Sequence, residues 1–309
     1  MKTIHAREHH FGWDNSIQPK VIVSPGTSIE IQTLDSSAMQ LNINSTVADL
    51  IALDLSKVNP VTGPIFIEGA EAGDAIKITF EEFKHSGWGW TANIPGFGLL
   101  ADQFTEPAIH IWKYDANNPT TSDFHRGGSV PLKPFVGTIG LALAEAGLHS
   151  VIPPRRVGGN LDIRDMSKGT ELMLPVEVAG GLLSMGDTHA AQGDGEVCGT
   201  AIESPIDVQV QIELVKNANI QSPRFTTLGP VSRHLDTKGY HVCTGVGSDL
   251  MIASRESVMR TIEFVSDRYK ISTIDAYMLC SVAGDLRISE IVDMPNWVVS
   301  FYFPRSIFE

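Results

Sequence analysis

Cysteine is scarce in this sequence, with three residues among 309, at Cys198, Cys243 and Cys280. An odd number of widely spaced thiols does not make the disulfide framework that stabilises small secreted proteins. The first ten residues, MKTIHAREHH, also lack the apolar run of a secretory signal. We therefore predict reduced thiols and a cytoplasmic location.

The sequence also has few positively charged residues and no long apolar runs. The chain has 23 Lys and Arg against 36 Asp and Glu, which gives a net charge of −13. Nucleic acids and anionic membranes bind basic surfaces, so we expect neither as a partner. No stretch approaches the roughly 18 consecutive apolar residues of a membrane-spanning helix.

The chain does contain enough apolar sequence for a large core. Hydrophobic residues make up 42% and charged residues 19%, which is typical of a globular protein. The length suggests about two domains. We predict an antiparallel β part over residues 1–135 and a β-rich part over 136–309, packed tightly enough to count as one domain.

Alternating apolar residues predict strands through most of the chain. Lys20–Val23 and Thr27–Thr33 flank a Ser-Pro-Gly turn, and Gly63–Gly69 and Asp74–Phe80 repeat this pattern. Val208–Leu214 alternates apolar and polar residues, which indicates a half-buried strand. The fold class is therefore mainly β, with a sandwich-like N-terminal part and a further β-barrel or sheet region.

Helical patterns occur only near the end of the chain. Ser254 is a candidate cap for a helix that runs to Tyr269, and Ser272 is a candidate cap for a second. Asp285–Val292 and Trp297–Phe303 read as strands that follow the helices. Together these elements predict a small C-terminal α+β element with two helices.

The most unusual stretch is Gly186–Glu203, where four acids, one imidazole and one thiol lie between two core-like strands. Asp187 and His189 are two residues apart, so on an extended segment their side chains face the same way. A carboxylate beside an imidazole begins a divalent-metal site. The alternative is a tight polar loop whose acids bond backbone N–H groups.

Two other segments supply candidates for the same site. Asp162 follows a Pro- and Gly-rich irregular segment, 152–162, and shares an i, i+2 spacing with Asn160, so it is a candidate third ligand. Trp88, Trp90 and Phe97 lie in a glycine-rich loop. These rings either wall a small apolar substrate pocket or plug the end of the β structure.

Several blocks along the chain resemble the acetamidase/formamidase family when taken together and in order. They are Trp13–Ser16, Pro60–Ile65, Glu68–Asp74, Trp88–Trp90 with Ile94–Leu100, Gly137–Gly140, Ile152–Arg155, Gly158–Asp162, Gly186–Glu196 and Tyr277–Ser289. Each block alone has little specificity, but the set runs nearly from end to end.

The resemblance implies a mainly β fold and hydrolysis of short linear amides, such as formamide and acetamide, to ammonium and the acid. It implies lactam opening in some relatives, a homo-oligomer, and a bound zinc or calcium ion. Asn59 stands where the resemblance leads us to expect histidine, and the histidine pair that begins at His9 is not a fixed family pattern. These departures weaken Asn59 and His9 as site residues.

Amide hydrolysis needs a nucleophile, a carbonyl activator and a proton donor for nitrogen. Zinc supplies the first two by lowering the pKa of bound water from about 15.7 to about 7 and by polarising the oxygen. We predict that Asp187, His189 and Asp162 hold the metal. Glu196 or Glu203 would take the water proton and pass it to the leaving nitrogen.

Two alternatives stay open at the level of sequence. In one, Cys198 is the nucleophile of an amidase or lactamase, with His189 or Glu196 as its base; a core position is the commoner role of a free cysteine. In the other, the chain is a non-catalytic β protein that binds calcium or a small ligand. Histidine is a poor calcium ligand, so His189 favours zinc.

Overall fold

The computed structural model describes residues 1–229, 235–292 and 294–309, and it is built mainly from strands. The first large sheet has the order β1 (Lys2–Ile4), β5 (Thr27–Ile31), β17 (Ile206–Val215), β7 (Ala75–His85), β15 (Glu171–Pro175) and β18 (Arg224–Thr226). The second has the order β14 (Gly158–Asn160), β12 (Phe135–Gly140), β16 (Leu183–His189), β6 (Val61–Ile67) and β2 (His9–His10), and β4 (Val21–Val23) also pairs with β6.

Smaller sheets complete the β structure. The paired strands are β3 (Gly12–Trp13) with β13 (His149–Ser150), β8 (Trp88–Asn93) with β9 (Ala108–Lys113), and β10 (Thr121–Phe124) with β11 (Gly128–Pro131). Near the C-terminus, β21 (Trp297–Pro304) lies between β19 (Tyr240–Gly247) and β20 (Asp285–Glu290). Short 3₁₀ turns occupy Leu55–Lys57, His125–Gly127 and Arg305–Ile307.

The main core lies between the two large sheets. One buried apolar cluster contains Val208 and Val210 of β17 as well as Ile65 of β6 and Met185 of β16. The predicted alternation of β17 is confirmed from Val208 to Ile212, because Val208, Val210 and Ile212 are fully buried while Gln209 and Gln211 are only partly covered; Leu214 is partly buried. This packing confirms the mainly β, sandwich-like prediction, and in the described part of the chain no sheet closes into a barrel.

Consecutive strands are not always neighbours. The predicted strands around the Ser-Pro-Gly turn are present as β4 and β5, but they belong to different sheets, as do β6 and β7. The pairs β1–β5 and β4–β6 are parallel, so the N-terminal part is not wholly antiparallel as predicted. Alternation reveals which face of a strand is buried, and it carries no information on the partner strand.

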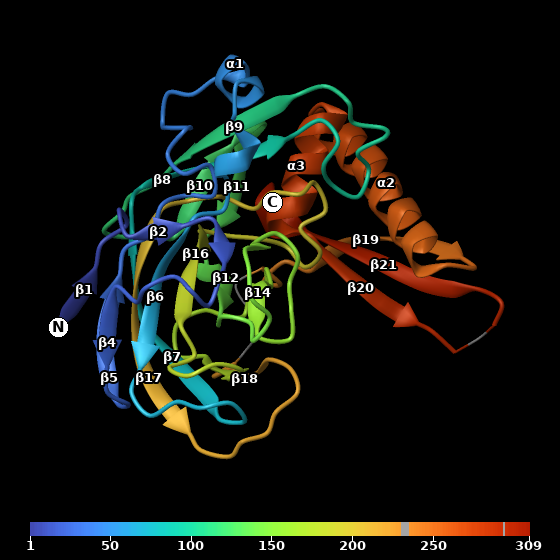
Figure 1. Ribbon diagram of the computed structural model, residues 1–309. Helices are drawn as coiled ribbons and strands as arrows, with labels where there is room; N and C mark the ends of the chain where they lie inside the picture. Colours follow the sequence, from blue (N-terminus) through green and yellow to red (C-terminus); the bar gives the residue numbers. More distant parts are fainter. Residues whose placement is uncertain (230–234, 293) are drawn as a thin grey trace.

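Both predicted parts of the chain contribute to both large sheets. In the first sheet β17 pairs with β5 and β7, and in the second β16 pairs with β6. Figure 1 shows the yellow and orange strands of the second half lying beside the blue and cyan strands of the first half. The boundary at residue 135 stays a prediction, and the sheets continue across it.

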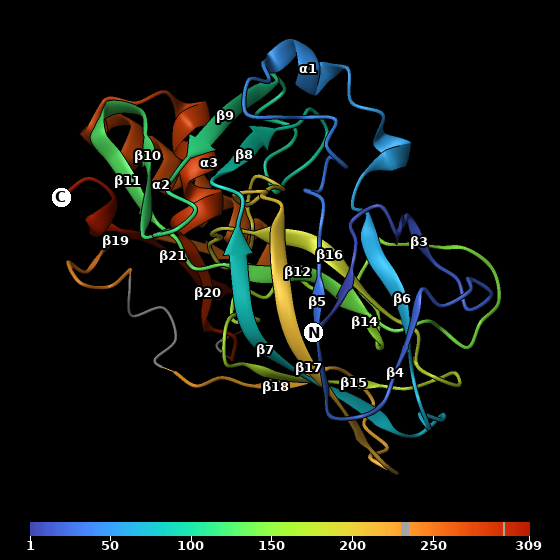
Figure 2. The same ribbon diagram turned by 90° about the vertical axis from the view of Figure 1, so that its left-hand side faces the viewer.

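The C-terminal helices lie with β19–β21 on one side of the β body (Figures 1 and 2). Helix α2 spans Leu250–Tyr269, and the prediction of Ser254 as its cap is wrong, because Asp249 accepts hydrogen bonds from the N–H groups of Met251 and Ile252. Helix α3 spans Thr273–Ala283 with Ser272 as its cap, as predicted.

A third, short helix, α1, spans Val47–Ile51. None of the helices in the described ranges has the length and apolar character that crossing a membrane requires.

Candidate functional site

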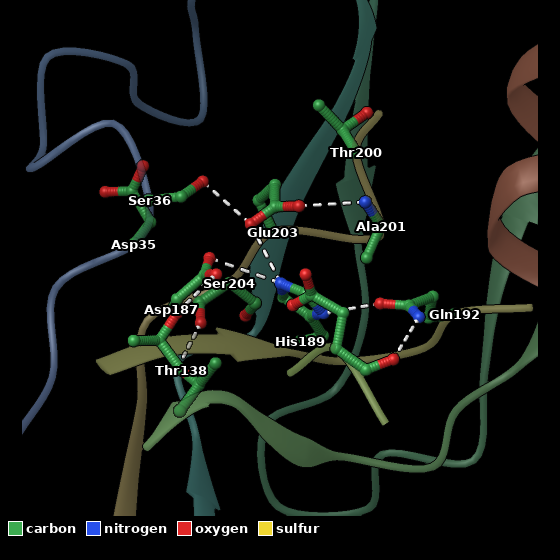
Figure 3. A network of polar contacts seen from close by, with 12 residues as sticks. Asp35, Ser36, Thr138, Asp187, His189, Gln192, Thr200, Ala201, Glu203 and Ser204 are labelled. Carbon is green, nitrogen blue, oxygen red and sulfur yellow. Dashed lines mark hydrogen bonds and ion pairs between the residues drawn. The ribbon is translucent and has the colours of Figure 1, made fainter. Parts of the chain in front are cut away.

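Strand β16 carries Asp187 and His189 into the interior. All seven residues of the strand are buried, because it is a central strand of the second sheet. His189 Nε2 lies 3.2 Å from Asp187 Oδ1 and 3.2 Å from Glu203 Oε2. Figure 3 shows both carboxylates directed toward this nitrogen. The predicted pairing of Asp187 with His189 is therefore present, and Glu203 joins it.

Glu203 comes from the segment that follows the acidic loop. Its backbone bridges to Trp90 and to His189, which fixes its position beside β16. Its Oε2 accepts a hydrogen bond from Ser36 Oγ at 2.7 Å, and its Oε1 accepts one from the N–H of Ala201 at 2.8 Å. Both oxygens of this buried carboxylate are therefore held by the protein.

Asp162 and Glu196 approach His189 from another side. The possible ligand atoms of Asp162, His189 and Glu196 lie within 4.8 Å of one another, and those of Asp187, His189 and Glu203 form a second such group. Oδ1 of Asp162 is buried and has no hydrogen-bond partner among the residues that the structure describes. The predicted ligands and bases thus all lie near His189, but the predicted ligand set is divided, because Asp162 groups with Glu196 and Asp187 groups with Glu203.

The five groups strongly affect one another's proton affinity. Burial lowers the pKa of His189, but the charges of Glu203 and Asp187 outweigh burial, so the pKa is well above its usual value. Burial raises the pKa of Asp187, but the positive charge of His189 and its hydrogen bond outweigh burial and hold the pKa below its usual value. These two groups therefore stabilise each other in charged form.

For the remaining carboxyl groups the effect of burial exceeds the attraction of His189. Burial, together with the charge of Asp187, raises the pKa of Asp162 to about 7. Burial, together with the charge of Asp162, raises the pKa of Glu196 well above its usual value. Burial also raises the pKa of Glu203. One imidazole does not neutralise four carboxyl groups, so the cluster favours either bound protons or a cation.

The backbone at this cluster adopts an uncommon conformation. Asn59, Asp162, Asp187 and Glu196 all have positive φ angles, between 42° and 50°. A non-glycine residue in this region costs on the order of 1–3 kcal/mol, and such residues gather at functional sites. The fold therefore holds these four side chains in place against a local preference for other conformations.

The donor set fits a divalent cation. It combines one imidazole nitrogen with several carboxylate oxygens, and the unpaired Oδ1 of Asp162 is an acceptor that lacks the partner a buried carboxylate requires. A histidine in the set favours a transition metal such as zinc, whereas the oxygen ligands also suit calcium. Asp162, Asp187 and His189 remain the predicted ligands.

A small cavity of about 130 Å³ opens above the cluster. Its polar lining includes Asp162, Asp187, Glu196 and Glu203, and its apolar lining includes Trp90 and Phe97. Trp90 is buried, and its Nε1 donates to Asp35 Oδ1 at 2.9 Å. Two of the three predicted aromatic wall residues therefore line the cavity.

Trp88 is the exception among these aromatic residues. It is half-buried and packs against the small apolar cluster of Leu41, Leu50, Trp90 and Ala92, and it is not among the residues that line the cavity. Trp88 is the first residue of β8, two positions before Trp90.

Several polar residues of the site were missed or undervalued at the level of sequence. Asn59 Nδ2 donates to Asp187 Oδ2 at 3.2 Å and Asn59 lines the cavity, so its weakening as a site residue was mistaken. Thr138 Oγ1 also donates to Asp187 Oδ2, at 3.1 Å. Ser36 and Thr138 lie far from residues 186–203 in the sequence, and no local pattern marked them.

Gln192 is the other missed residue, although it lies in the acidic stretch. Its Nε2 donates to the carbonyl of Asp162 at 2.7 Å, so its Oε1 faces His189 Nδ1 at 2.9 Å (Figure 3). An oxygen at this place requires a proton on Nδ1. Gln192 therefore fixes the orientation of the His189 ring and leaves Nε2 facing the carboxylates. Its spacing of three residues from His189 was the available signal.

Cys198 is placed as a core residue. It is fully buried, its Sγ lies 3.6 Å from the carbonyl oxygen of Ala92, and it is not among the residues that line the cavity. Burial raises the pKa of its thiol to about 11, whereas a reactive cysteine needs a lowered pKa. These features favour the other candidates over a thiol nucleophile.

Comparison with known proteins identifies the family of this chain. The family model described as the acetamidase/formamidase family matches residues 2–150 and 141–309. This chain belongs to the acetamidase/formamidase family. The match extends over both large sheets and over the C-terminal helices, so the site lies within it.

Named members of the family are similar over most of the chain. A formamidase from Methylophilus methylotrophus is 28% identical, over 97% of this chain and 89% of that protein. An acetamidase from Mycolicibacterium smegmatis is 29% identical, over 67% of this chain and 66% of that protein.

Solved structures show the same fold. An acetamidase from Bacillus halodurans has a TM-score of 0.69 and 28% identity, covering 98% of this chain and 97% of its own. A gamma lactamase from Delftia acidovorans has a TM-score of 0.91 at 24% identity, covering all of this chain and 94% of its own, and this likeness shows the fold alone.

Proposed function

We propose that this protein hydrolyses the C–N bond of short linear amides to ammonia and the carboxylic acid, with the help of a divalent cation. The observation that carries the proposal is a group of four carboxyl groups that line a small cavity and surround one imidazole buried behind them. Membership of the family makes the chain a hydrolase of carbon–nitrogen bonds other than peptide bonds.

Asp187, His189 and Asp162 are the residues that would hold the cation. When bound, zinc would polarise the amide carbonyl and make water more acidic. The protein prepares the ligands for this role in two ways. Asn59 and Thr138 hold Asp187 through its Oδ2, and Gln192 holds the imidazole through Nδ1. These contacts fix the ligands before any ion binds.

Glu196 is the better placed of the two predicted bases. Both oxygens of Glu203 already accept hydrogen bonds from the protein, and its Oε2 also lies 3.2 Å from His189 Nε2. Both carboxyl groups line the cavity and burial raises the pKa of each, so the hydrogen bonds held by Glu203 are what distinguish the two. Glu196 would take a proton from the attacking water as the C–O bond forms. It would return that proton to nitrogen as the C–N bond breaks and ammonia leaves.

The proposal is tested by the metal content of the purified protein together with ammonia release before and after chelation. We expect about one zinc per chain, loss of activity on chelation and recovery on adding zinc. Chelation should also lower the Tm, because a ligand that binds only the folded state stabilises it. A metal-free protein that keeps full activity would overturn the role of the cation, and a Cys198→Ser variant would then test the thiol.

A homo-oligomer and a cytoplasmic location remain predictions from the sequence. Exposed apolar residues near the end of β20 support the first of these, with Ile288 59%, Ile291 50% and Val292 78% exposed. Light scattering on the purified protein gives the number of chains directly.

A further inference from the structure

We propose that Asp35, a buried residue outside the cavity, is a positioning residue of the site. Its carboxylate shapes a turn, and the next residue in that turn, Ser36, makes two contacts that lead to the acids beside His189. The inference rests on the proposed metal-assisted hydrolysis. It goes further by naming a residue that prepares the site for the cation without contacting the cavity.

The carboxylate of Asp35 is fully buried and is satisfied by hydrogen bonds from the protein. Oδ1 accepts from Trp90 Nε1 at 2.9 Å, from the N–H of Ser37 at 2.9 Å and from Ser37 Oγ. Oδ2 accepts from the N–H of Met39 at 2.9 Å. Burying a carboxylate costs free energy unless it is hydrogen-bonded, so these bonds hold Asp35 inside and connect the turn to Trp90. Asp35 itself is not among the residues that line the cavity.

The turn that follows Asp35 has an uncommon backbone conformation. Ala38 and Met39 have positive φ angles, of 56° and 61°. Non-glycine residues adopt this conformation only at a cost in free energy. The carboxylate offsets this cost by accepting from the N–H groups of Ser37 and Met39, and the carbonyl of Asp35 accepts from the N–H of Ala38 at 2.8 Å. Without the carboxylate we expect the turn to relax and Ser36 to move.

Ser36 connects the turn to two acids of the site. Its Oγ donates to Glu203 Oε2 at 2.7 Å, and Figure 3 shows this contact, with Asp35 beside Ser36. The carbonyl oxygen of Ser36 accepts from the N–H of Asn59 at 2.7 Å, and Asn59 Nδ2 donates to Asp187 Oδ2 at 3.2 Å. Glu203 and Asp187 are the two carboxylates beside His189 Nε2. A displaced Ser36 would therefore disturb both of them.

Trp90 closes these contacts into a ring. Its N–H donates to the carbonyl of Glu203 at 2.9 Å, and the N–H of Glu203 donates to the carbonyl of Trp90 at 2.8 Å. The indole of Trp90 donates to Asp35, and Ser36 leads back to the carboxylate of Glu203. The ring therefore holds both the backbone and the side chain of Glu203. Groups fixed in advance bind a ligand more tightly, because less order is lost on binding.

The experiment measures the zinc affinity of the metal-free protein by competition with a chelator, together with the Tm. We expect Asp35→Ala to lower the zinc affinity about tenfold, because it disturbs both contacts of Ser36. Asp35→Asn keeps one acceptor oxygen for Trp90 and Ser37, so its loss of affinity should be clearly smaller. Equal losses in the two variants would show that the acceptor at Asp35 does not position the site.

Asp74 supplies the matched control, because it is another buried aspartate that holds a turn and lies outside the site. It is 3% exposed and accepts from the N–H groups of Glu71 and Asn217, each at 2.9 Å, and from Lys216 Nζ at 2.7 Å. Asp74→Ala should lower the Tm much as Asp35→Ala does, but it should leave the zinc affinity unchanged. If Asp35 acted only on stability, the two variants would agree in both measurements.

Ser36→Ala tests the route from the turn to the acids. It removes one hydroxyl group and leaves Asp35 in place, so it tests the inference even if Asp35→Ala does not fold. We expect a loss of zinc affinity of a few fold, since the contact through Asn59 remains. The double variant should lose little more than Asp35→Ala alone, because both changes break the same contact to Glu203. Losses that multiply in full would contradict the route through Ser36.

The outcomes separate this inference from the proposed function. Zinc binding in the unmodified protein, with the same affinity in Asp35→Ala or in Ser36→Ala, would overturn the inference alone. A protein that binds no zinc even before these changes would overturn the proposed role of the cation and the inference with it.

Discussion

The loop that contains Asp162 and Arg164 and the loop that contains Asp194 and Glu196 contribute to two buried polar clusters. The two clusters differ in whether their positive and negative charges balance. Asp162 and Glu196 belong to the site, whereas Arg164 and Asp194, each two residues away, belong to an ion-pair cluster with Asp285. Asp285 is fully buried, and its Oδ2 accepts hydrogen bonds from Arg164 Nη2 at 3.0 Å and from Arg287 Nη2 at 3.1 Å.

The comparison separates a structural role from a functional one. In the ion-pair cluster a second bond joins Arg164 to Oδ1 of Asp285, and the N–H of Asp194 also points to Oδ1, so the carboxylate is fully partnered. In the site, four carboxyl groups share one imidazole and Asp162 Oδ1 has no partner. A completed cluster holds loops together, and an incomplete one is prepared for a ligand.

The largest expected effect is on activity at the incomplete cluster. Glu196→Gln removes the proposed proton carrier, so kcat/KM for amide hydrolysis should fall about 100- to 10,000-fold. Thermal unfolding should show an unchanged or higher Tm, because the variant removes one of the excess acids. Asp194→Asn is the matched control, two residues away with a side chain that is 49% exposed, and it should keep near-normal activity. Equal loss in both variants would contradict the comparison.

The complete cluster should show the opposite pattern. Asp285→Asn leaves Arg164 buried with a weakened partner, and we expect a loss of about 3–5 kcal/mol in the free energy of unfolding, measured in denaturant. The control is Arg287→Gln, whose side chain is 45% exposed, and its loss should stay below about 1 kcal/mol. A small loss for Asp285→Asn would mean that this ion pair does not hold the loops.

Gln192 connects His189 to the loop of Asp162, and replacing it tests whether this connection orients the ligand. Gln192→Ala removes the acceptor at His189 Nδ1, and we expect zinc affinity of the metal-free protein to fall about 10- to 100-fold in competition with a chelator. Gln192→Glu keeps an acceptor there and should retain most of the affinity. Equal affinities in all three proteins would show that the bond to His189 does not orient the ligand.

The smallest effect concerns His110, where burial outweighs the weak attraction of Asp275. Burial and the neighbouring His125 lower the pKa of His110 to about 4, in contrast to His189. Between pH 6.5 and 4 the unfolded chain binds a proton at this residue that the folded chain does not, so stability falls as the pH falls through this range. His110→Gln should reduce the fall in Tm between pH 7 and pH 5, and an unchanged profile would contradict this account.

Local patterns predicted individual elements well. The strand predicted at Val208–Leu214 is present as β17 and the cap at Ser272 is as predicted, because alternation and capping are properties of a few consecutive residues. The start of α2 was wrong because two capping residues, Asp249 and Ser254, compete within one turn and a half, and only Asp249 bonds the free N–H groups.

The candidate site was predicted in part. One stretch of the sequence contains Asp187, His189, Glu196 and Glu203, so their residue types and spacing were sufficient to predict them as site residues. Ser36, Asn59 and Thr138 reach the same carboxylates from strands and loops far away in the chain. No sequence signal marked Ser36, and the family resemblance touched the positions of Asn59 and Thr138 without indicating that they contact the acids.

The sequence by itself determined the mainly β class, the family resemblance and the acidic stretch, because each depends on residue type and local order. Only the tertiary structure decided which strands pair, which acids are partnered, and which acids and apolar residues line the cavity. These features depend on burial and on contacts between distant segments. Asp162 and Arg164 are two residues apart, and the fold alone sends one to the site and the other to an ion pair.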